Sequence, residues 1–338
     1  MPELVVVTGG TGYVAGWLIV GLLRRGYAVR TTIRAASREA AVRESIGSEV
    51  DAGGRLSFAL ADLLDDAGWD AAMDGADYVL HAASPLGNEH SENADELIIP
   101  ARDGTLRVLR AARDAGVKRV VMTSAANAAS PASYTTAGVT DESLWTLDDP
   151  SMPAYRRSKT LAERAAWDFI AAGTGAMTLT TVLPGAVFGP VLSAGNIGST
   201  RIIARMLSGG MRGLPRIGLE VVDVRDLADL HIRAMESPQA AGERFLGTGE
   251  FAWMREIAEA LRTELGEQAA KVPTRQLPDL MVRAAARSDP SLRAIAISLG
   301  RQNRHSTAKA QQVLGWSARP ASETVVACAR SLIAHGVV

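Results

Sequence analysis

The amino-acid sequence predicts an α/β fold: a doubly wound parallel sheet with a small, mainly helical C-terminal region. Short β-branched runs alternate with alanine-rich helical stretches through the first half of the chain. The strand candidates are apolar throughout rather than alternating with polar residues, which is typical of strands covered on both faces. A glycine-rich turn joins the first strand candidate to the first helix candidate. Strand–helix alternation of this kind predicts a doubly wound sheet.

The elements of the first half follow from these runs in chain order. Strands are expected at Leu4–Val7, Ala28–Ile33, Leu56–Leu60, Tyr78–Ala82, Arg119–Thr123 and Thr178–Leu183. Helices are expected from about Tyr13 to Arg25, Ser37 to Ile46, Ala101 to Ala115, and from Tyr155 onward. Each strand is a short apolar or β-branched run, and the helix after the second strand is rich in charged residues.

The pattern changes after residue 183. Pro184–Gly189 is interpreted as a turn and residues 195–218 as loop-rich, whereas Glu220–Val222 and a helix at Arg225–Glu236 are interpreted as a return to the sheet domain. Further helices are expected at Trp253–Leu265, Leu277–Arg287 and Thr307–Leu314. The predicted organisation is a sheet domain over residues 1–190, rejoined by about 220–243, and a substrate-binding region formed by 191–219 and 244–338.

Composition excludes several classes of function. The chain has 338 residues with 36 Lys and Arg against 37 Asp and Glu, so it lacks the basic surplus of a nucleic-acid-binding protein. Its single cysteine, Cys328, excludes an intrachain disulfide and a cysteine-based metal cluster, and it fits the cytoplasm. No run reaches the roughly 18 to 20 apolar residues of a membrane-spanning helix. The five histidines show no metal-ligand spacing, and His81 is interpreted as a packed core residue, so no metal is expected.

The glycine-rich turn predicts a dinucleotide site. It reads Thr8-Gly9-Gly10-Thr11-Gly12-Tyr13-Val14-Ala15 and lies between a strand and a helix. Gly9 permits the tight turn, Gly12 lets the backbone approach a pyrophosphate, and Ala15 is small enough for close packing of helix on strand. The unpaired N–H groups and the positive dipole end of the helix then favour the phosphates.

The end of the second strand distinguishes between the two nicotinamide cofactors. An acidic residue there would bind the ribose of NAD, whereas an arginine accommodates the 2′-phosphate of NADP. The strand ends in Arg34, with Arg38 four residues further on. We therefore expect NADP(H). Asp62, just after the third strand, is expected to bond the adenine amine.

A candidate catalytic pair follows the fifth strand. Tyr155-Arg156-Arg157-Ser158-Lys159 opens a helix, and residues four apart lie on one helix face. A free tyrosine has a pKa near 10, which is too high for efficient proton transfer at neutral pH. A neighbouring lysine ammonium favours the phenolate and lowers that pKa, so Tyr155 can act as a general acid.

Several motifs together resemble an extended short-chain dehydrogenase/reductase, in the branch of dihydroflavonol reductases, cinnamoyl-CoA reductases and microbial aldehyde and ketone reductases. They are the glycine-rich turn, His81-Ala82-Ala83-Ser84-Pro85, Val121-Met122-Thr123-Ser124-Ala125-Ala126, Tyr155 to Lys159, Leu183 to Pro190 and Val222 to Ala228. The resemblance runs over most of the chain and implies a Rossmann-type fold with a separate substrate region.

The resemblance also implies roles for individual residues. Tyr155 would donate the proton to a carbonyl oxygen, and Lys159 would bind the nicotinamide ribose as well as lower the Tyr155 pKa. The expected cofactor-binding residues are Gly9, Thr11, Gly12, Tyr13, Val14, Arg34, Asp62, Leu63, Ala82, Ala83, Ser84, Tyr155, Lys159, Pro184, Gly185 and Val187. Among them, Ala82 to Ser84 would line the middle of the cofactor, and Pro184, Gly185 and Val187 would flank its carboxamide.

One position departs from the family. Relatives usually carry Thr-Ser-Ser after the fifth strand, and the second serine polarises the substrate oxygen; here that register holds Ala125. Ser124 and Ala125 point to opposite faces of an extended strand, so Ser124 is not an automatic substitute. Either the strand end presents Ser124 or Thr123, or Asn127 or a water molecule holds the oxygen. Ser124 is the expected third catalytic residue.

The predicted function is an NADPH-dependent carbonyl reductase that converts aldehydes or ketones to alcohols, reversibly. Alternatives are an NADP-binding sensor without turnover, which Ala125 favours, and a nucleotide-sugar epimerase or hydroxysteroid dehydrogenase of the same fold. The substrate pocket is expected to be built by residues 86–96, 129–153 and 193–218. The sequence leaves the substrate open, and it allows a monomer or a homodimer.

Overall fold

The protein is described by a computed structural model over residues 2–84, 94–195, 197–287 and 296–338. Seven parallel strands form the central sheet in the spatial order β10-β7-β5-β4-β1-β2-β3. These strands are β1 (Leu4–Val7), β2 (Ala28–Ile33), β3 (Leu56–Leu60), β4 (Tyr78–His81), β5 (Arg119–Thr123), β7 (Thr178–Pro184) and β10 (Arg244–Gly247). The predicted doubly wound parallel sheet is confirmed.

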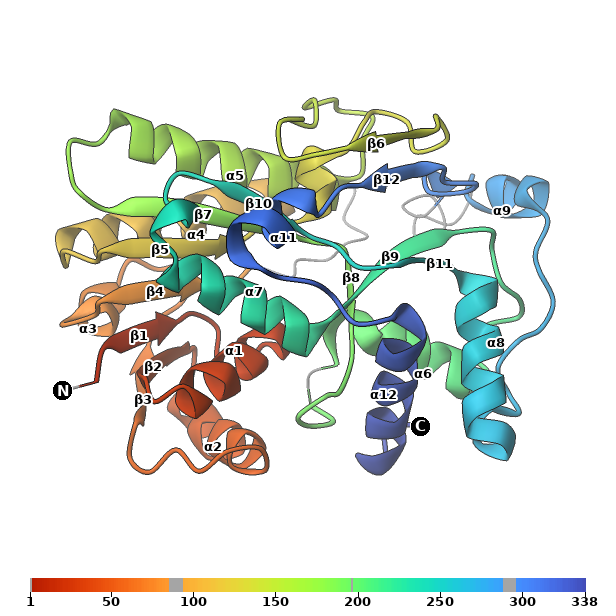
Figure 1. Ribbon diagram of the computed structural model, residues 1–338, viewed down its shortest axis with the longest axis horizontal. Helices are drawn as coiled ribbons and strands as arrows, with labels where there is room; N and C mark the ends of the chain where they lie inside the picture. The colour runs from red at the N-terminus through yellow and green to blue at the C-terminus, as the bar shows by residue number, and fades with distance from the viewer. Residues whose placement is uncertain (1, 85–93, 196, 288–295) are drawn as a thin grey trace.

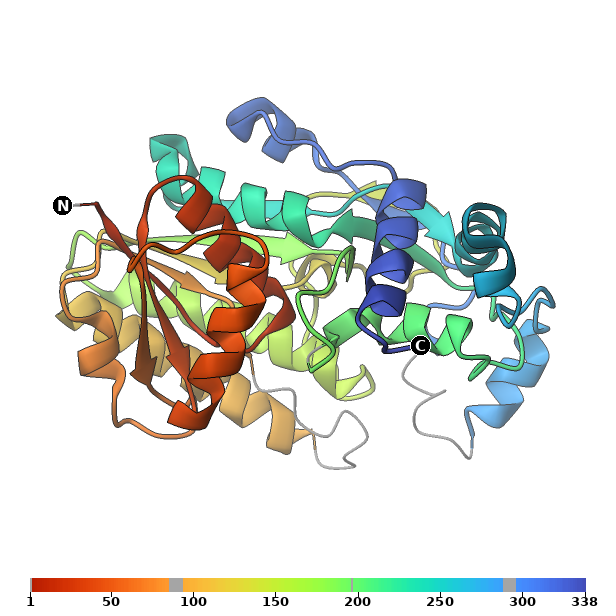
Figure 2. The same cartoon turned by 90° about the horizontal axis from the view of Figure 1, so that it is seen from below.

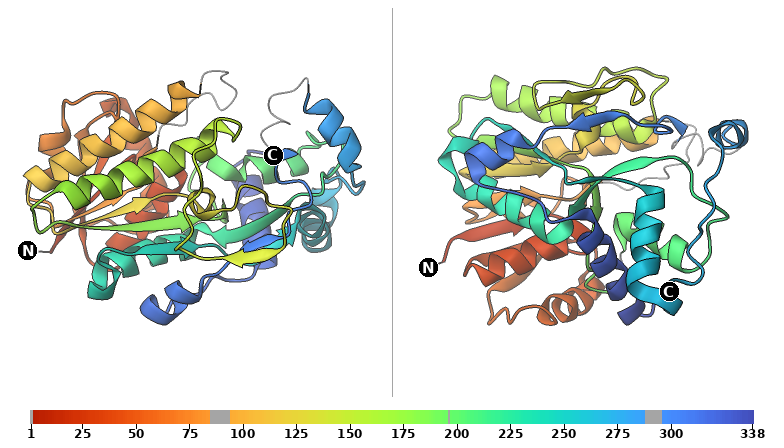
Figure 3. Two further views of the ribbon diagram at one scale, coloured as in Figure 1. Left: turned by 90° about the horizontal axis from the view of Figure 1, so that it is seen from above. Right: turned by 45° about the vertical axis from the view of Figure 1, so that its right-hand side comes forward.

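Helices cover both faces of this sheet (Figures 1 and 2). One face carries α1 (Tyr13–Arg24), α2 (Glu39–Gly47) and α7 (Val224–Glu236), and the other carries α3 (Trp69–Met73), α4 (Asp95–Asp114) and α5 (Ala154–Ala172). Figure 3 shows α4 and α5 side by side over their face. Helix α4 begins at Asp95, before the predicted start at Ala101, and it continues through Pro100, whose missing N–H removes one hydrogen bond from the helix interior.

Strand β1 illustrates why a buried parallel strand reads as a continuous apolar run. Val5, Val6 and Val7 are fully buried. Val5 and Val7 pack into the same core as helix α1, whereas Val6 packs into the core beneath α4. Successive side chains point to opposite faces, so both faces require apolar residues.

A second, smaller layer corrects two expectations (Figure 1). Residues 184–189 are not only a turn, because they contain strand β8 (Ala186–Phe188), which is too short to show a pattern in the sequence. Strand β9 (Gly218–Asp223) pairs with β8 and with β11 (Phe251–Trp253), so Glu220–Val222 belongs to a three-stranded sheet rather than to the central one. Strand β10, which begins at the predicted boundary of 244, instead extends the edge of the central sheet.

The remaining α-helices of the described residues lie in the C-terminal half of the chain, where α11 packs against β10 and α7. They are α6 (Arg201–Leu207), α8 (Met254–Leu265), α9 (Asp279–Ala285), α11 (Ala308–Leu314) and α12 (Ala321–Ala334), of which α6 and α12 were not predicted. Strand β12 (Asn303–His305) pairs in parallel with β6 (Gly138–Thr140), which joins the C-terminal part to the segment after β5. Cys328 lies on α12 without exposed surface, and burial raises the pKa of its thiol to about 12. Within the described ranges, no helix combines the length and the apolar character needed to cross a membrane.

Candidate active site

The order in which the strands join the central sheet reverses beside β1. After β1 the chain adds β2 and β3 on one side, and it then adds β4, β5 and β7 on the other side. In open α/β sheets, ligands bind at the carboxyl ends of the strands where the order reverses. Here that point lies between β1 and β4, and the glycine-rich turn follows β1.

The geometry of the glycine-rich turn fits a dinucleotide. Gly9 has φ +75°, and a Cβ there would lie 3.0 Å from Cβ of Ala83. A Cβ at Gly10 would lie 2.3 Å from Oγ1 of Thr31. Gly12 caps α1 without a side-chain hydrogen bond, and the first turn of α1 holds no acidic residue. The helix therefore begins with backbone N–H groups that no side chain caps, which is the arrangement that favours a phosphate.

The segment after β4 is held against this turn by one hydroxyl. Thr8 Oγ1 accepts a hydrogen bond of 3.0 Å from the N–H of Ala83, and it lies 2.9 Å from Nδ1 of His81. Burial lowers the pKa of His81 to about 3, so the ring is neutral in the core. Ala82, Ala83 and Ser84 are half-buried at this edge, whereas Pro85 lies outside the described residues.

The carboxyl ends of β2 and β3 lie on the same side of the sheet as the glycine-rich turn. Arg34 directly follows β2, and its side chain is exposed, as is that of Arg38 in the short 3₁₀ helix η1 (Ala36–Arg38). Asp62 Oδ1 accepts a 3.0 Å hydrogen bond from the N–H of Leu64, which fixes the loop after β3. Asp62 and Leu63 are half-buried there. Two exposed guanidinium groups, those of Arg34 and Arg38, therefore lie in the segment that follows β2.

Tyr155 and Lys159 lie on the first two turns of α5. Lys159 Nζ is 6.0 Å from the centroid of the Tyr155 ring. Tyr155 is partly exposed, whereas Lys159 is buried. Burial lowers the pKa of Lys159 to about 8, and the nearby Glu163 carboxylate opposes this shift. The arrangement presents a reachable phenol beside a buried ammonium, as the spacing of four residues predicted.

A buried ion pair that the sequence analysis missed lies one turn further along α5. Arg244 Nε donates to Glu163 Oε1 at 2.9 Å, and both side chains are buried. Ser124 Oγ donates to Glu163 Oε2 at 2.6 Å, and Thr181 Oγ1 donates to Oε1 at 2.7 Å. Ser124 as the substrate-oxygen donor therefore stays a prediction that this hydrogen bond does not support, because its hydroxyl is directed to Glu163. The available signal for this ion pair was Glu163 itself, an acidic residue four positions after Lys159 and therefore on the same helix face.

The other two side chains considered as oxygen donors have different surroundings. Thr123 Oγ1 lies 2.8 Å from Nε2 of His231, which is fully buried on α7. Asn127 lies in the 3₁₀ helix η2 (Ala126–Ala129) that follows β5, and its Oδ1 accepts a 2.7 Å hydrogen bond from the hydroxyl of Tyr134. Asn127 is half-buried.

Residues 184–189 link the two layers. A Cβ at Gly185 would lie 2.3 Å from the carbonyl oxygen of Glu220, so β8 and β9 require glycine there. Tyr13 donates a hydrogen bond from its hydroxyl to the carbonyl of Gly189 at 2.9 Å. Pro184 and Val187 are buried beside this contact.

A second buried carboxylate was also missed. Glu220 accepts a 2.6 Å hydrogen bond from the backbone N–H of His305, and its Oε2 contacts Arg301. His305 Nε2 lies 3.0 Å from Oγ of Ser130, just after η2. These contacts attach the C-terminal segment around His305 to the loop that follows β5 and η2. Glu220 sits in an apolar run, and an acidic residue within such a run was the available signal.

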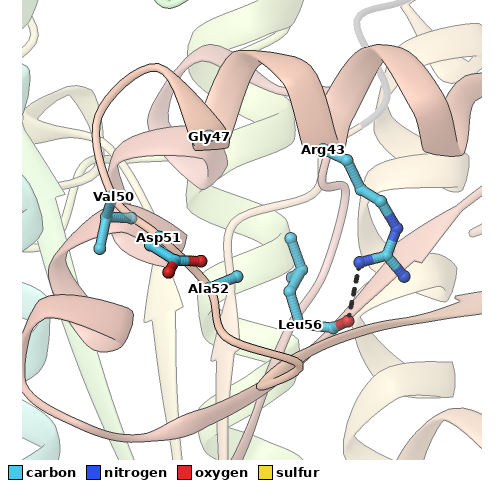
Figure 4. A pocket seen from close by; sticks show the side chains of 6 residues that line it. All are labelled: Arg43, Gly47, Val50, Asp51, Ala52 and Leu56. Atoms are coloured by element: carbon cyan, nitrogen blue, oxygen red, sulfur yellow. Dashed lines mark hydrogen bonds between the residues drawn. The ribbon is translucent and has the colours of Figure 1, made fainter.

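Other features lie away from this edge. The pocket in Figure 4, of about 370 Å³, is lined by residues between α2 and the amino end of β3, at the opposite edge of the sheet. Within the described ranges, no group of three His, Cys, Asp or Glu side chains is arranged to hold a metal ion. Of the expected pocket segments, residues 86–93 and 196 lie outside the described part of the chain.

Comparison with known proteins places the chain in a family. The model of the NAD dependent epimerase/dehydratase family matches residues 5–246. The chain belongs to this family. That match spans the glycine-rich turn, the Tyr155–Lys159 pair and all seven strands of the central sheet.

Within the family, the chain is similar to reductases. It is 36% identical to "Cinnamoyl-CoA reductase CAD2" of Medicago truncatula over 285 residues, 82% of this chain and 84% of that protein. The structure of Gre2 from Candida albicans in complex with NADPH has a TM-score of 0.80 and 26% identity over 99% of both chains. Yeast Gre2, a methylglyoxal/isovaleraldehyde reductase complexed with NADPH, has a TM-score of 0.82 and 22% identity, and it covers 99% of this chain and 100% of its own. The resemblance to oxidoreductases of the extended short-chain group is confirmed.

Proposed function

We propose that this protein is an NADPH-dependent carbonyl reductase that converts aldehydes or ketones to alcohols, reversibly. The observation that carries the proposal is the Tyr155–Lys159 pair, a reachable phenol beside a buried ammonium. Arg34 and the absence of an acidic residue in the segment 34–38 favour the 2′-phosphate of NADP over NAD. The reductases among the relatives, two of them complexed with NADPH, support the same assignment.

Residues at the carboxyl ends of the strands orient the cofactor and the substrate. The N–H groups at the start of α1 bind the pyrophosphate, and Arg34 binds the 2′-phosphate. Lys159, four residues after Tyr155, binds the ribose next to the nicotinamide. When bound, the cofactor supplies the hydride that reaches the carbonyl carbon.

Proton transfer is the task of Tyr155. Its hydroxyl donates a hydrogen bond to the carbonyl oxygen and passes the proton to that oxygen as negative charge develops there. The Lys159 ammonium stabilises the phenolate left behind, because opposite charges attract strongly in a site with little water. The net reaction adds one hydride to carbon and one proton to oxygen.

The test compares two tyrosine variants in an assay of NADPH absorbance with a panel of aryl and aliphatic aldehydes and ketones. Tyr155→Phe is expected to lose about 10² to 10⁴-fold in kcat, which is the usual contribution of a general acid. Tyr27→Phe is the control, because its hydroxyl contacts Glu236 at the surface, and it should retain the parent rate. Equal rates for Tyr155→Phe and the parent would remove Tyr155 from its role.

An NADP-binding sensor without turnover is the second candidate, and Ala125 in place of the usual serine is the observation that favours it. Calorimetric binding of NADPH without turnover across the panel would support the sensor. The same assay with NADH in parallel reports the cofactor preference.

A further inference from the structure

The register normally occupied by a hydroxyl at the substrate oxygen holds Ala125, which has no polar side chain. A carbonyl that accepts a hydride develops negative charge on its oxygen, and a second donor beside the proton donor lowers the barrier substantially. If the proposed reductase activity holds, some group near the end of β5 must supply that donor. The side chains available in the described structure are those of Thr123, Ser124 and Asn127.

Two of these three are occupied by buried partners. Thr123 pairs with His231. Ser124 donates to Glu163, and a hydroxyl has one proton to donate. Turning Ser124 toward a substrate would leave the buried Glu163 carboxylate with one donor fewer, which is unfavourable for a buried charge.

Asn127, unlike Thr123 and Ser124, has hydrogen-bond donors that are not used by a buried partner among the described residues. Its Oδ1 accepts the Tyr134 hydroxyl at 2.7 Å, which fixes the plane of the amide. A terminal amide has two N–H donors on Nδ2, and no hydrogen bond of Nδ2 is found within the described ranges. The side chain is half-buried, so Nδ2 is not sealed in the core.

The surroundings of Asn127 connect it to the first turn of α5. The Tyr134 ring stacks against Arg156, whose guanidinium lies 5.0 Å from the ring centroid. Arg156 in turn donates to the carbonyl of Ser130 at 2.8 Å, directly after η2. Arg156 follows Tyr155 in the chain. Contacts through Tyr134 and Arg156 therefore link the Asn127 amide to the residue next to the proton donor.

We propose that the side-chain amide of Asn127 replaces the missing serine and donates a hydrogen bond from Nδ2 to the substrate carbonyl oxygen, with Tyr134 as its positioning residue. The inference rests on the proposed reductase function. During reduction, Tyr155 transfers its proton to the oxygen, whereas Asn127 keeps its protons and stabilises the charge by hydrogen bonding alone. The product is the alcohol, and the Asn127 amide is unchanged.

The experiment measures kcat, KM and the NADPH Kd of four variants with a carbonyl that the parent enzyme reduces. Asn127→Ala is expected to lower kcat by about 10² to 10³-fold, the usual effect of removing one such donor, with an unchanged Kd for NADPH. Asn127→Asp, which keeps the shape and loses the N–H donors, should be impaired at least as much. Gln312→Ala on the exposed face of α11 is the control and should match the parent.

The fourth variant, Ala125→Ser combined with Asn127→Ala, restores a hydroxyl at the usual register. It should recover at least tenfold of the lost kcat, which a merely structural role of Asn127 would not predict. Turnover by the parent together with an Asn127→Ala variant within twofold of it would overturn this inference and leave the proposed function intact. A parent without turnover would overturn the proposed function and the inference with it.

Discussion

Replacing Arg244 by methionine removes the charge partner of a carboxylate that has no exposed surface. In the native protein the Arg244 guanidinium donates to both oxygens of Glu163, at 2.9 and 3.3 Å. It also donates to the carbonyl of Leu144 at 3.0 Å and lies 3.7 Å above the ring of Trp145. The substitution therefore loses an ion pair, a tie between β10 and the segment after β6, and a stacking contact.

The structure sets the expected magnitude. Removing one partner of a buried ion pair costs about 3–5 kcal/mol, because the other charge stays buried without compensation. Ser124 and Thr181 still donate to Glu163 in the variant, at 2.6 and 2.7 Å, so the lower end of about 3 kcal/mol is expected. In a chain of this size the loss corresponds to a thermal midpoint lower by roughly 4 °C.

The assay is thermal unfolding followed by near-ultraviolet circular dichroism, to which Trp145 contributes. Arg255→Met is the matched control, because its pair with Glu259 is exposed and contributes about 0.5 kcal/mol or less. Adding Glu163→Gln to Arg244→Met removes the uncompensated charge and should recover at least about 1 kcal/mol. A single Arg244→Met variant as stable as the control, or a double variant no better than the single one, would refute the reasoning.

Three further outcomes are expected at the cofactor edge. Burial holds the pKa of Lys159 at about 8 in the folded chain, below its ordinary 10.5, so the unfolded chain binds more protons between these two pH values. Lys159 therefore destabilises the fold most below pH 8. The variant Lys159→Met should raise the thermal midpoint at pH 7 and lose turnover. Gly10→Ala places a Cβ 2.3 Å from Thr31 and should weaken NADPH binding in a fluorescence titration at least tenfold, whereas Gly47→Ala, with open space around its Cβ, should bind as the parent does. Arg34→Ala should raise the Kd for NADPH about tenfold and leave that for NADH unchanged, since one charge-assisted hydrogen bond contributes about 1.5–3 kcal/mol.

The central sheet was predictable because each of its first six strands is a short apolar run with its own local signal. Strand β8 was not, since three residues between Gly185 and Gly189 carry too little pattern and form a strand only by pairing with β9. Strand β10 was misassigned for a related reason. Arg244 opens it with a charged side chain, and contacts with distant segments, above all with Glu163 on α5, make that charge compatible with burial.

The candidate site divides in the same way. The glycine-rich turn and the Tyr155–Lys159 pair follow from spacing along the chain, because a tight turn and one helix face are local geometries. The partners of Thr123 and Ser124 lie far away in the sequence, on α7 and α5, whereas the partner of Asn127 is Tyr134 in the loop that follows η2. Spacing alone therefore left the oxygen donor open among these side chains, and the three-dimensional contacts separate them.

The buried position of Cys328 has a practical consequence for following this protein in solution. A thiol whose pKa lies at about 12 and whose surface is fully covered forms almost no thiolate at neutral pH, and the thiolate is the form that reacts. The folded chain consequently has no background toward maleimide dyes, since this is its single cysteine. A cysteine introduced at exposed Leu280 on α9 would carry one fluorophore or spin label at a known place.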